Sequence, residues 1–503
     1  MASKKRNSRK KGRNRMRSKK NMFAFTATFF AVWAMTICPL YLENQYFNLR
    51  ESKGHAFLVG AFITLLLIVI SAFTDDDGLK PLIPEKKDVT DWAIVVFGVL
   101  GLFSTCISGY FHDSFWGSQA WWVGGFQQIC FVIFVLMMSK KLKWTETLKY
   151  TMLIIGYMVF FFGLLHSMDI DIFFLHRNTA SPFAYISTMG NINWYVGYLC
   201  LTVPIFAVLF MNAYEKKDVI LYGIYMFLAC IGIVTCKSDG TYVGIGMCAF
   251  FAIPFVMSTA ERLSRFMMIV GFFGISNLMI SVLPIFEECK GYFDGIPAIM
   301  LKPVIAIAMI VVGAAGWFLA DRFYPEENDK VVKISIYVLE GVVALGAMYF
   351  VIDAIRNWGP DWGTKRGEIW GNAVNVFKES PFHQKLIGTG PETLHIVNAP
   401  YSQARGELVL ANHSDFFQLF TTNGIIGVGA WITMWVSIIV KFIKNKDIER
   451  KSYMFLLPAM AYMGQSLFNT MESMTWPMLM VVISLYLHYF REERKEELEL
   501  EDE

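Results

Sequence analysis

The chain has 503 residues, of which 55% are hydrophobic and 17% charged, with a formal net charge of +3 and a mean hydropathy of +0.43. These values exclude an ordinary soluble protein and indicate a helical protein that crosses a membrane many times. Alternating apolar and polar segments of the kind that build a membrane barrel are absent from the sequence, so helices are the expected spanning elements.

The chain begins with a basic segment, residues 1–21, which is rich in Lys and Arg and contains no Asp or Glu. A cationic segment beside a membrane span is attracted to anionic lipids, so we expect contact with membrane lipids and no nucleic-acid partner. The same charge predicts a cytoplasmic N-terminus. The acidic tail, residues 491–503, is also predicted to be cytoplasmic, because an even number of spans separates the two ends.

Apolar runs of roughly 17–25 residues, the length that crosses a bilayer, follow the basic segment. The predicted fold is all-α and polytopic, with about 14 transmembrane helices: 11 within residues 22–352 and three within 424–490. The predicted spans are 22–42, 55–74, 91–108, 121–138, 148–166, 194–212, 218–236, 240–257, 266–285, 303–320, 334–352, 424–440, 453–470 and 474–490. Most Lys and Arg then fall in the segments on the cytoplasmic side, which predicts a multi-pass membrane protein with both ends in the cytoplasm.

The segments predicted on the outer side are longer and richer in polar and aromatic residues than those on the inner side. The outer segment 167–193 contains Arg177, Asn191 and Asn193, and Trp194 follows it. Asn side chains at the entrance of a span can bind sugar hydroxyls and Trp can stack on a sugar ring, although Trp is also common at membrane interfaces without any ligand.

Two further features interrupt the apolar runs. Lys237 to Gly240 forms a predicted tight turn, for which an internal ion pair is the simplest role. Glu340 is a carboxylate in the middle of the span 334–352. An ionisable group at this depth usually marks a function or a buried pair, and it favours a transporter as the alternative function.

The segment 353–423 is a long polar stretch before the last three spans, and we expect an extracytoplasmic loop that does work. Its residues 368–377 have apolar side chains at helical spacing, and Ser380-Pro381 should end that helix. Residues 388–391 predict a turn. A second helix should begin near Asn412, Ser414 or Asp415, each of which could cap it, and for Asp415 capping is favoured over a role beside His413.

Four residues of this loop could carry chemistry. Lys365 and Arg366 are predicted just before a helix start, where backbone N–H groups also favour anions, and Arg can hold a phosphate with two donors. His413 precedes the second helix, a position that keeps imidazole neutral and able to accept a proton. Asp415 could orient it. No cysteine pair, metal-ligand spacing or nucleotide motif was found, so we predict no metal and no cofactor.

These residues resemble the motifs of the bacterial O-antigen ligase and O-antigen polymerase superfamily. The resemblance rests on an ordered set of short motifs across about 175–445: Gly190-Asn191-Ile192-Asn193, Arg366-Gly-Glu-Ile369-Trp370, Pro381 with Gly388-Thr-Gly390, and His413-Ser-Asp-Phe416-Phe417-Gln418 followed by Gly424-Ile-Ile-Gly427. The chain departs from the family at Ser414, where Asn is usual, at Thr422, where Glu is frequent, and at Asp239, where the family often has Arg.

The resemblance implies a metal-independent membrane glycosyltransferase that polymerises or ligates a cell-surface polysaccharide. The donor would be a polyprenyl-diphosphate-linked oligosaccharide and the acceptor a hydroxyl of a glycan or lipid-glycan. Arg366 would hold the diphosphate and His413 would act as the base. The substrate-binding residues would be Arg177, Arg405, Lys365, Asn191, Asn193, Asp415 and Gln418.

Two other functions remain open at this point. A flippase or other transporter of lipid-linked oligosaccharides would depend on Glu340 and not on His413. A membrane sensor without catalysis would not need the ordered motifs. The sequence does not separate a polymerase from a ligase, because the two differ in the acceptor.

Overall fold

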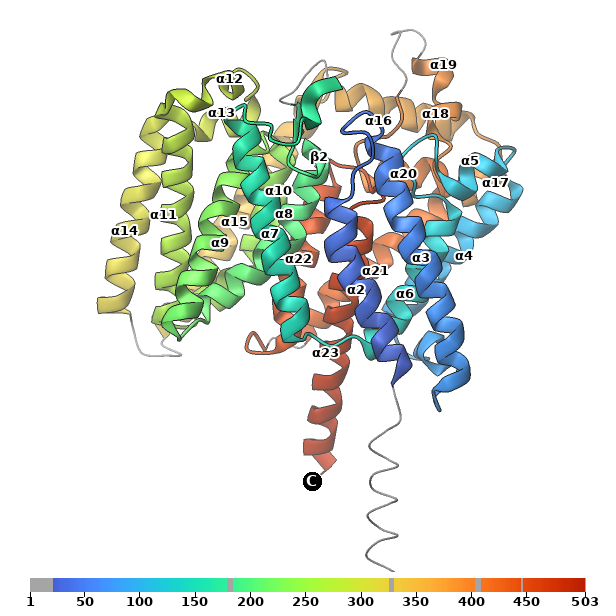
Figure 1. Cartoon of the computed structure of the whole chain (residues 1–503), viewed down its shortest axis with the longest axis horizontal. Coiled ribbons are helices and arrows are strands. Elements are labelled where there is room, and N and C mark those ends of the chain that lie inside the picture. Colours follow the sequence, from blue (N-terminus) through green and yellow to red (C-terminus); the bar gives the residue numbers. More distant parts are fainter. Residues whose placement is uncertain (1–20, 179–183, 325–329, 403–408, 445–446, 503) are drawn as a thin grey trace, which may run out of the picture.

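The computed structural model describes residues 21–178, 184–324, 330–402, 409–444 and 447–502. Long helices stand side by side in one bundle, and shorter helices cover one of its ends (Figure 1). The strands of the described residues form only one two-residue antiparallel pair, β1 (Tyr185–Ile186) with β2 (Gly190–Asn191). The helical prediction is therefore confirmed.

The helices divide into long ones and short ones. The long helices are α2 (Met22–Leu40), α3 (Leu49–Thr74), α4 (Val89–Ile107), α6 (Gly125–Lys141), α7 (Glu146–Ser167), α8 (Ile192–Met211), α9 (Lys216–Thr235), α10 (Asp239–Val256), α11 (Ala260–Val282), α14 (Pro303–Phe323), α15 (Lys330–Arg356), α16 (Trp362–Glu379), α21 (Gly424–Lys444), α22 (Lys451–Ser466) and α23 (Trp476–Asp502). The short helices are η1 (Lys80–Leu82), α5 (Phe111–Trp116), η2 (Leu175–Asn178), η4 (Pro284–Phe286), α12 (Glu287–Lys290), α13 (Gly295–Met300), α17 (Phe382–Ile387), α18 (Leu394–Val397), α19 (Ala399–Ser402) and α20 (Asp415–Thr422).

Eleven of the described helices are long and apolar enough to cross a membrane: α2, α3, α4, α7, α8, α9, α10, α11, α14, α15 and α21. Each corresponds to a predicted span. The other three predicted spans are also helical, but α6 and α22 have only 17 and 16 residues, and the second half of α23 is highly charged. A polytopic helical membrane protein is the architecture that these helices indicate.

The core of the bundle lies around α22, which packs against α8, α10 and α23. Side chains on all sides of α8 and α22 are buried, so a hydrophobic surface surrounds each of them. At the periphery, α14 packs mainly on α11, and α15 buries none of the residues of its most apolar stretch. Such an exposed apolar helix is stable only where lipid replaces water.

The two ends of the bundle differ. The helices α16, α18 and α19 lie at one end together with α12 and α13, while the C-terminal end of α23 lies at the other (Figure 1). At that C-terminal end, Arg491 forms ion pairs with Asp88, Asp91 and Glu85, and Lys441 forms one with Asp88. These buried pairs tie the start of α4 to α21 and α23. We call this set of five residues the ion-pair cluster.

Candidate functional site

The described residues of the segment 357–423 fold as a cap on the bundle, and the main contact within this cap is between α16 and α20. Trp370 of α16 stacks on Phe417 of α20 with ring centroids 4.7 Å apart, and Phe377 stacks on Phe420 at 4.2 Å. The indole N–H of Trp370 also donates to the carbonyl of Asn412, at 2.7 Å. The predicted amphipathic helix is thus confirmed, and its apolar face serves to place the segment that carries His413.

Arg366 lies within α16, four residues after its start, and not ahead of the helix as the sequence predicts. Its Nε donates to the carbonyl of Phe468 at 3.2 Å, and its Nη1 donates to the carbonyl of Gly363 at 3.0 Å. Among the described residues no carboxylate lies within ion-pair distance of this guanidinium. Burial lowers the pKa of Arg366, while Asp239 and Asp294 at longer range raise it. A half-buried, charged guanidinium therefore has donors left for an anion.

His413 lies within electrostatic range of Arg366, although 46 residues separate them in the chain. It has a left-handed backbone conformation, with φ of +49°, immediately before α20. Burial, followed by the positive charge of Arg366, lowers the pKa of His413 to about 4. The imidazole is therefore neutral near pH 7 and able to accept a proton. The structure brings together the two residues that the sequence selects for catalysis.

Asp415 does not cap α20 as expected. The capping position belongs to Ser414, whose side chain makes no capping hydrogen bond. Asp415 is fully buried and instead accepts a hydrogen bond from the backbone N–H of Met471, 56 residues away. Burial and nearby Glu472 raise its pKa well above the ordinary value, against the opposing effect of the Met471 bond. The carboxyl group is therefore neutral and turned into the protein.

Gln418 is buried on the same face of α20 as Asp415. Its Oε1 accepts from the backbone N–H of Asn412 at 3.1 Å, while Asn412 also donates from its side chain to the carbonyl of Phe417 at 2.9 Å. These bonds fix the chain just before His413. They occupy the amide oxygen of Gln418, while its buried Nε2 has no partner among the described residues, so substrate binding by Gln418 stays a prediction.

A glycine turn supports the far end of α20. The backbone N–H of Gly390 donates to the carbonyl of Thr422 at 3.0 Å, and Gly388 has φ of +85°. A Cβ atom at Gly388 would lie 2.1 Å from the carbonyl oxygen of Thr422. The turn predicted at 388–391 is confirmed, and its glycines are needed because the two backbones are in contact.

Asn191 and Asn193 lie at the start of α8. Asn191 caps this helix by accepting from the backbone N–H of Asn193 at 2.8 Å. Asn193 in turn accepts from the hydroxyl of Ser238, at 3.4 Å, just before α10. Both side chains are half-buried and have local partners. Their structural role is plain, and sugar binding by either stays a prediction.

The remaining predicted substrate-binding cations are not part of the Arg366–His413 pair. Lys365 is exposed, next to Arg366 but with a left-handed φ of +70°. Arg177 is exposed on η2. Arg405 lies outside the described residues.

The sequence missed the link between α22 and α23, residues 467–475, because the span predicted at 453–470 runs past the observed end of α22 at Ser466. This link supplies the carbonyl of Phe468 to Arg366 and the N–H of Met471 to Asp415. It also contains Glu472, which is buried and whose pKa burial raises to about 7. The sequence contained one signal for this link, namely the acidic residue Glu472 between two apolar runs.

Glu392 is a second buried carboxyl that the sequence did not single out. It accepts a hydrogen bond from the backbone N–H of Trp121 at 2.7 Å and so joins the cap to the segment before α6. Burial raises the pKa of Glu392 to about 8, although the Trp121 bond and Arg50 lower it. This carboxyl is neutral in the folded protein at neutral pH.

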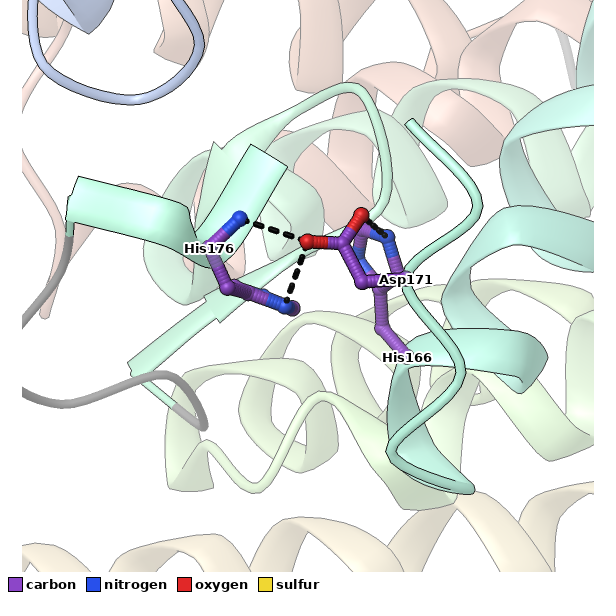
Figure 2. A group of neighbouring side chains, drawn as sticks. All are labelled: His166, Asp171 and His176. Atoms are coloured by element: carbon purple, nitrogen blue, oxygen red, sulfur yellow. Dashed lines mark hydrogen bonds and ion pairs between the residues drawn. The ribbon is translucent and has the colours of Figure 1, made fainter. Parts of the chain in front are cut away.

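One group in the described part of the chain has metal-ligand chemistry: His166, Asp171 and His176, whose ligand atoms lie within 4.8 Å of one another. Figure 2 shows the carboxyl of Asp171 between the two imidazole rings. Nε2 of His166 and Nδ1 of His176 each lie 3.6 Å from one of its oxygens. However, Nδ1 of His166 accepts from the backbone N–H of Ser187 at 3.0 Å.

That hydrogen bond decides the chemistry of the cluster. A backbone N–H can only donate, so Nδ1 of His166 carries the lone pair and the proton of the neutral ring is on Nε2. Nε2 faces Asp171, and with its proton in place it is not a metal ligand. The three residues therefore do not fit a metal. Backbone hydrogen bonds from Asp169 to His166 and from Ile170 to Leu165 hold the start of the segment 168–178 against the end of α7, and Asp171 accepts from the backbone N–H of His176 within that segment.

The site thus consists of a charged guanidinium and a neutral imidazole at one end of the bundle, with buried neutral carboxyls behind them. This arrangement can hold an anionic group and remove a proton from a hydroxyl beside it. When the chain is compared with models of known protein families and with curated proteins, no match is found.

Proposed function

We propose that this protein is a membrane glycosyltransferase that transfers a glycan from a polyprenyl-diphosphate carrier to an acceptor hydroxyl, and so polymerises or ligates a cell-surface polysaccharide. The observation that supports it best is the juxtaposition of Arg366, whose partners are two carbonyl oxygens, with His413, which is neutral. The order of motifs resembling the O-antigen ligase and polymerase superfamily agrees with this function.

In the proposed reaction His413 removes the proton from the acceptor hydroxyl, whose oxygen attacks the anomeric carbon of the donor. A new C–O bond forms while the bond between that carbon and the diphosphate oxygen breaks. The electron pair leaves with the diphosphate, and Arg366 stabilises the negative charge that develops there. The proton on His413 returns to solvent or to the leaving group.

The proposal includes a topology with 14 spans, in which α6, α22 and α23 also cross the membrane and the loop 353–423 lies on the extracytoplasmic side. The position of α16 and α20 at the end of the bundle opposite the C-terminus supports it (Figure 1). The carrier's lipid tail would lie along the apolar helices, with its diphosphate at the bundle end that carries Arg366. Residues 1–21 and the acidic tail would then face the cytoplasm of a bacterium.

The test uses purified full-length protein in lipid nanodiscs, with a polyprenyl-diphosphate-linked oligosaccharide as donor and the matching glycan as acceptor. We expect Arg366→Ala and His413→Ala each to lower transfer by at least about a hundredfold. The matched controls are Arg356→Ala and His383→Ala, which remove exposed residues of the same type. Normal transfer by the two site variants would refute the proposal.

A cellular assay distinguishes the transporter alternative. If the protein polymerises repeat units, its loss leaves single units at the cell surface, whereas loss of a transporter removes surface units altogether. A phenotype that follows Glu340→Gln and not His413→Ala would favour transport. Glu340 is half-buried on α15, away from any ion pair among the described residues.

A further inference from the structure

Three protein segments hold Arg366 and His413, and a hydrogen bond joins each two of them, beside the ring contacts of Trp370 with Phe417 and Phe468. These segments are α16, the chain from 412 to α20, and the link 467–475 between α22 and α23. We call the three bonds between them the hydrogen-bond circuit. Each bond uses a backbone atom of one segment and a side chain of another.

The first bond joins α16 to the link: Nε of Arg366 donates to the carbonyl of Phe468, at 3.2 Å. The second joins the link to α20: the N–H of Met471 donates to Asp415. The third closes the circuit, because Trp370 donates to the carbonyl of Asn412 at 2.7 Å. Trp370 lies one helical turn after Arg366, so both bonds leave the same face of α16.

Hydrogen bonds hold the link on both sides of Met471, so a shift at Met471 can change the position of Phe468. The backbone N–H groups of Phe468 and Asn469 both donate to the carbonyl of Gln465, at 3.0 Å each. Farther along, Ser473 donates to the carbonyl of Trp121 at 3.2 Å, and Glu472 accepts from the N–H of Met474 at 2.7 Å. Between these anchors, the only described contact from the link to the chain that carries His413 at hydrogen-bond distance is Met471 with Asp415.

We propose that Asp415 is a positioning residue, which holds the 467–475 link so that the carbonyl of Phe468 directs Arg366 toward His413. This inference deepens the proposed function and rests on it only for the identity of the reaction. Asp415 touches neither reacting group. It acts two steps away, through Met471 and then Phe468.

The consequence for the site follows from electrostatics. Arg366 helps to keep His413 neutral, so a guanidinium that moves away should let the imidazole hold its proton at higher pH. The groups acting on His413 are its burial and Arg366, while Asp239 and Asp294 act on Arg366. A change in the protonation of His413 therefore reports the position of Arg366.

The experiment compares Asp415→Ala, which removes the acceptor, with Asp415→Asn, which keeps a side-chain oxygen for the N–H of Met471. In purified full-length protein without substrate, the pH dependence of His413 modification by diethyl pyrocarbonate is followed by mass spectrometry. This readout needs no glycosyl transfer, so it stands even if the proposed function fails.

We expect the midpoint for His413 to lie near pH 4 in the wild type and in Asp415→Asn, and at a higher pH in Asp415→Ala. In transfer assays, Asp415→Ala should lower kcat by about tenfold or more, since orientation of a catalytic group matters mainly in the transition state. KM for the acceptor should change little. Rescue by Asn should restore most of kcat.

A second variant covers the case in which Asp415→Ala does not fold. Trp370→Phe removes the indole N–H that closes the circuit and keeps a ring to stack on Phe417. It should move the His413 midpoint in the same direction, whereas its control, Trp358→Phe, should not. The ring of Trp358 lies beside that of Trp370, with centroids 5.6 Å apart, and takes no part in the hydrogen-bond circuit. A wild-type midpoint in folded Asp415→Ala or in Trp370→Phe would overturn the proposal.

Discussion

Two arginines at opposite ends of the bundle, the buried Arg491 and the half-buried Arg366, have opposite surroundings. Arg491, in the ion-pair cluster, faces the carboxylates of Asp88, Asp91 and Glu85. Arg366, at the end covered by α16 and α20, donates to two backbone carbonyls. The charge of Arg491 is neutralised by residues from the start of α4, while that of Arg366 is not.

The comparison separates two uses of a buried charge. A guanidinium paired with carboxylates attracts no further anion, so it ties helices together. A guanidinium held by neutral carbonyls has a defined position, and no carboxylate neutralises its charge. A site for an anionic substrate needs both properties. The carboxyls follow the same division, because Asp88 is ionised beside Lys441 and Arg491, whereas Glu392 and Asp415 are neutral.

The largest expected effect comes from replacing the two arginines in turn. Arg491→Ala leaves the buried carboxylate of Asp91 without its ion-pair partner, which costs about 3–5 kcal/mol of stability. Arg366→Ala leaves only carbonyls and should cost about 1 kcal/mol or less. The measurement is the apparent Tm in detergent, followed by size-exclusion chromatography. If the two variants lose the same stability, the distinction between the ends is wrong.

The second prediction concerns alkaline pH. The pKa of Glu392 in the folded protein, about 8, lies above its ordinary value of 4.5, so its contribution to stability is complete below pH 4.5 and is lost as the pH rises through 8. Glu392→Gln keeps the acceptor for Trp121 and removes this loss, a gain on the order of a few kcal/mol at pH 9. The Tm between pH 5 and 9 measures it.

The control for that experiment is Glu379→Gln, which changes an exposed carboxyl of the same cap. Its Tm profile should follow the wild type at every pH. At the opposite end, the pKa of Asp88 is lowered by Lys441 and Arg491, which outweigh the effect of burial. Acid should therefore weaken the ion-pair cluster as alkali weakens the cap. Equal alkaline losses in Glu392→Gln and the wild type would contradict the assignment.

A third, smaller effect should follow from Arg366→Lys. Lysine keeps the positive charge but cannot donate to Phe468 and at the same time hold a phosphate with a planar pair of N–H groups. We expect kcat/KM for transfer to fall by about ten- to a hundredfold, less than in Arg366→Ala. Full activity of the lysine variant would mean that charge alone suffices and that the carbonyl contacts have no role.

The smallest effect should come from Lys365→Ala. Lys365 neighbours Arg366 in sequence, but its side chain is exposed, and charge at an exposed position is screened by salt. Transfer should change by less than about threefold, mostly at low ionic strength. A loss comparable to that of Arg366→Ala would place Lys365 in the site and end the claim that a fixed position distinguishes the two cations.

The parts of the fold that follow from local pattern could be predicted from the sequence. Apolar runs located the helices, and the spacing of Trp370 and Phe377 located α16 and the face that it buries. The turn at Gly388 followed from its glycines. Arg366 and His413 belong to one polar segment of the sequence, and in the structure they lie within electrostatic range of each other.

The contacts that hold the site could not be predicted in the same way. The link 467–475 meets Arg366 and Asp415 across 102 and 56 residues of sequence, and it does so through backbone atoms. A capping role for Asp415 was the best local interpretation, and tertiary contact with Met471 replaced it. Likewise the sequence gives no sign that His166 offers its lone pair to Ser187, which determines what the histidine cluster does.

The carbonyl of Phe468 has a consequence for how such a site changes over evolutionary time. Every amino acid has a backbone carbonyl, so residue 468 can be replaced many times while the oxygen that receives Arg366 remains. The N–H of Met471 is likewise present in every residue except proline. Gly363 differs, because its φ of +60° disfavours other residues. The sequence around a fixed arginine can therefore change greatly within a lineage. Common ancestry would then be easier to recognise from the fold than from the sequence.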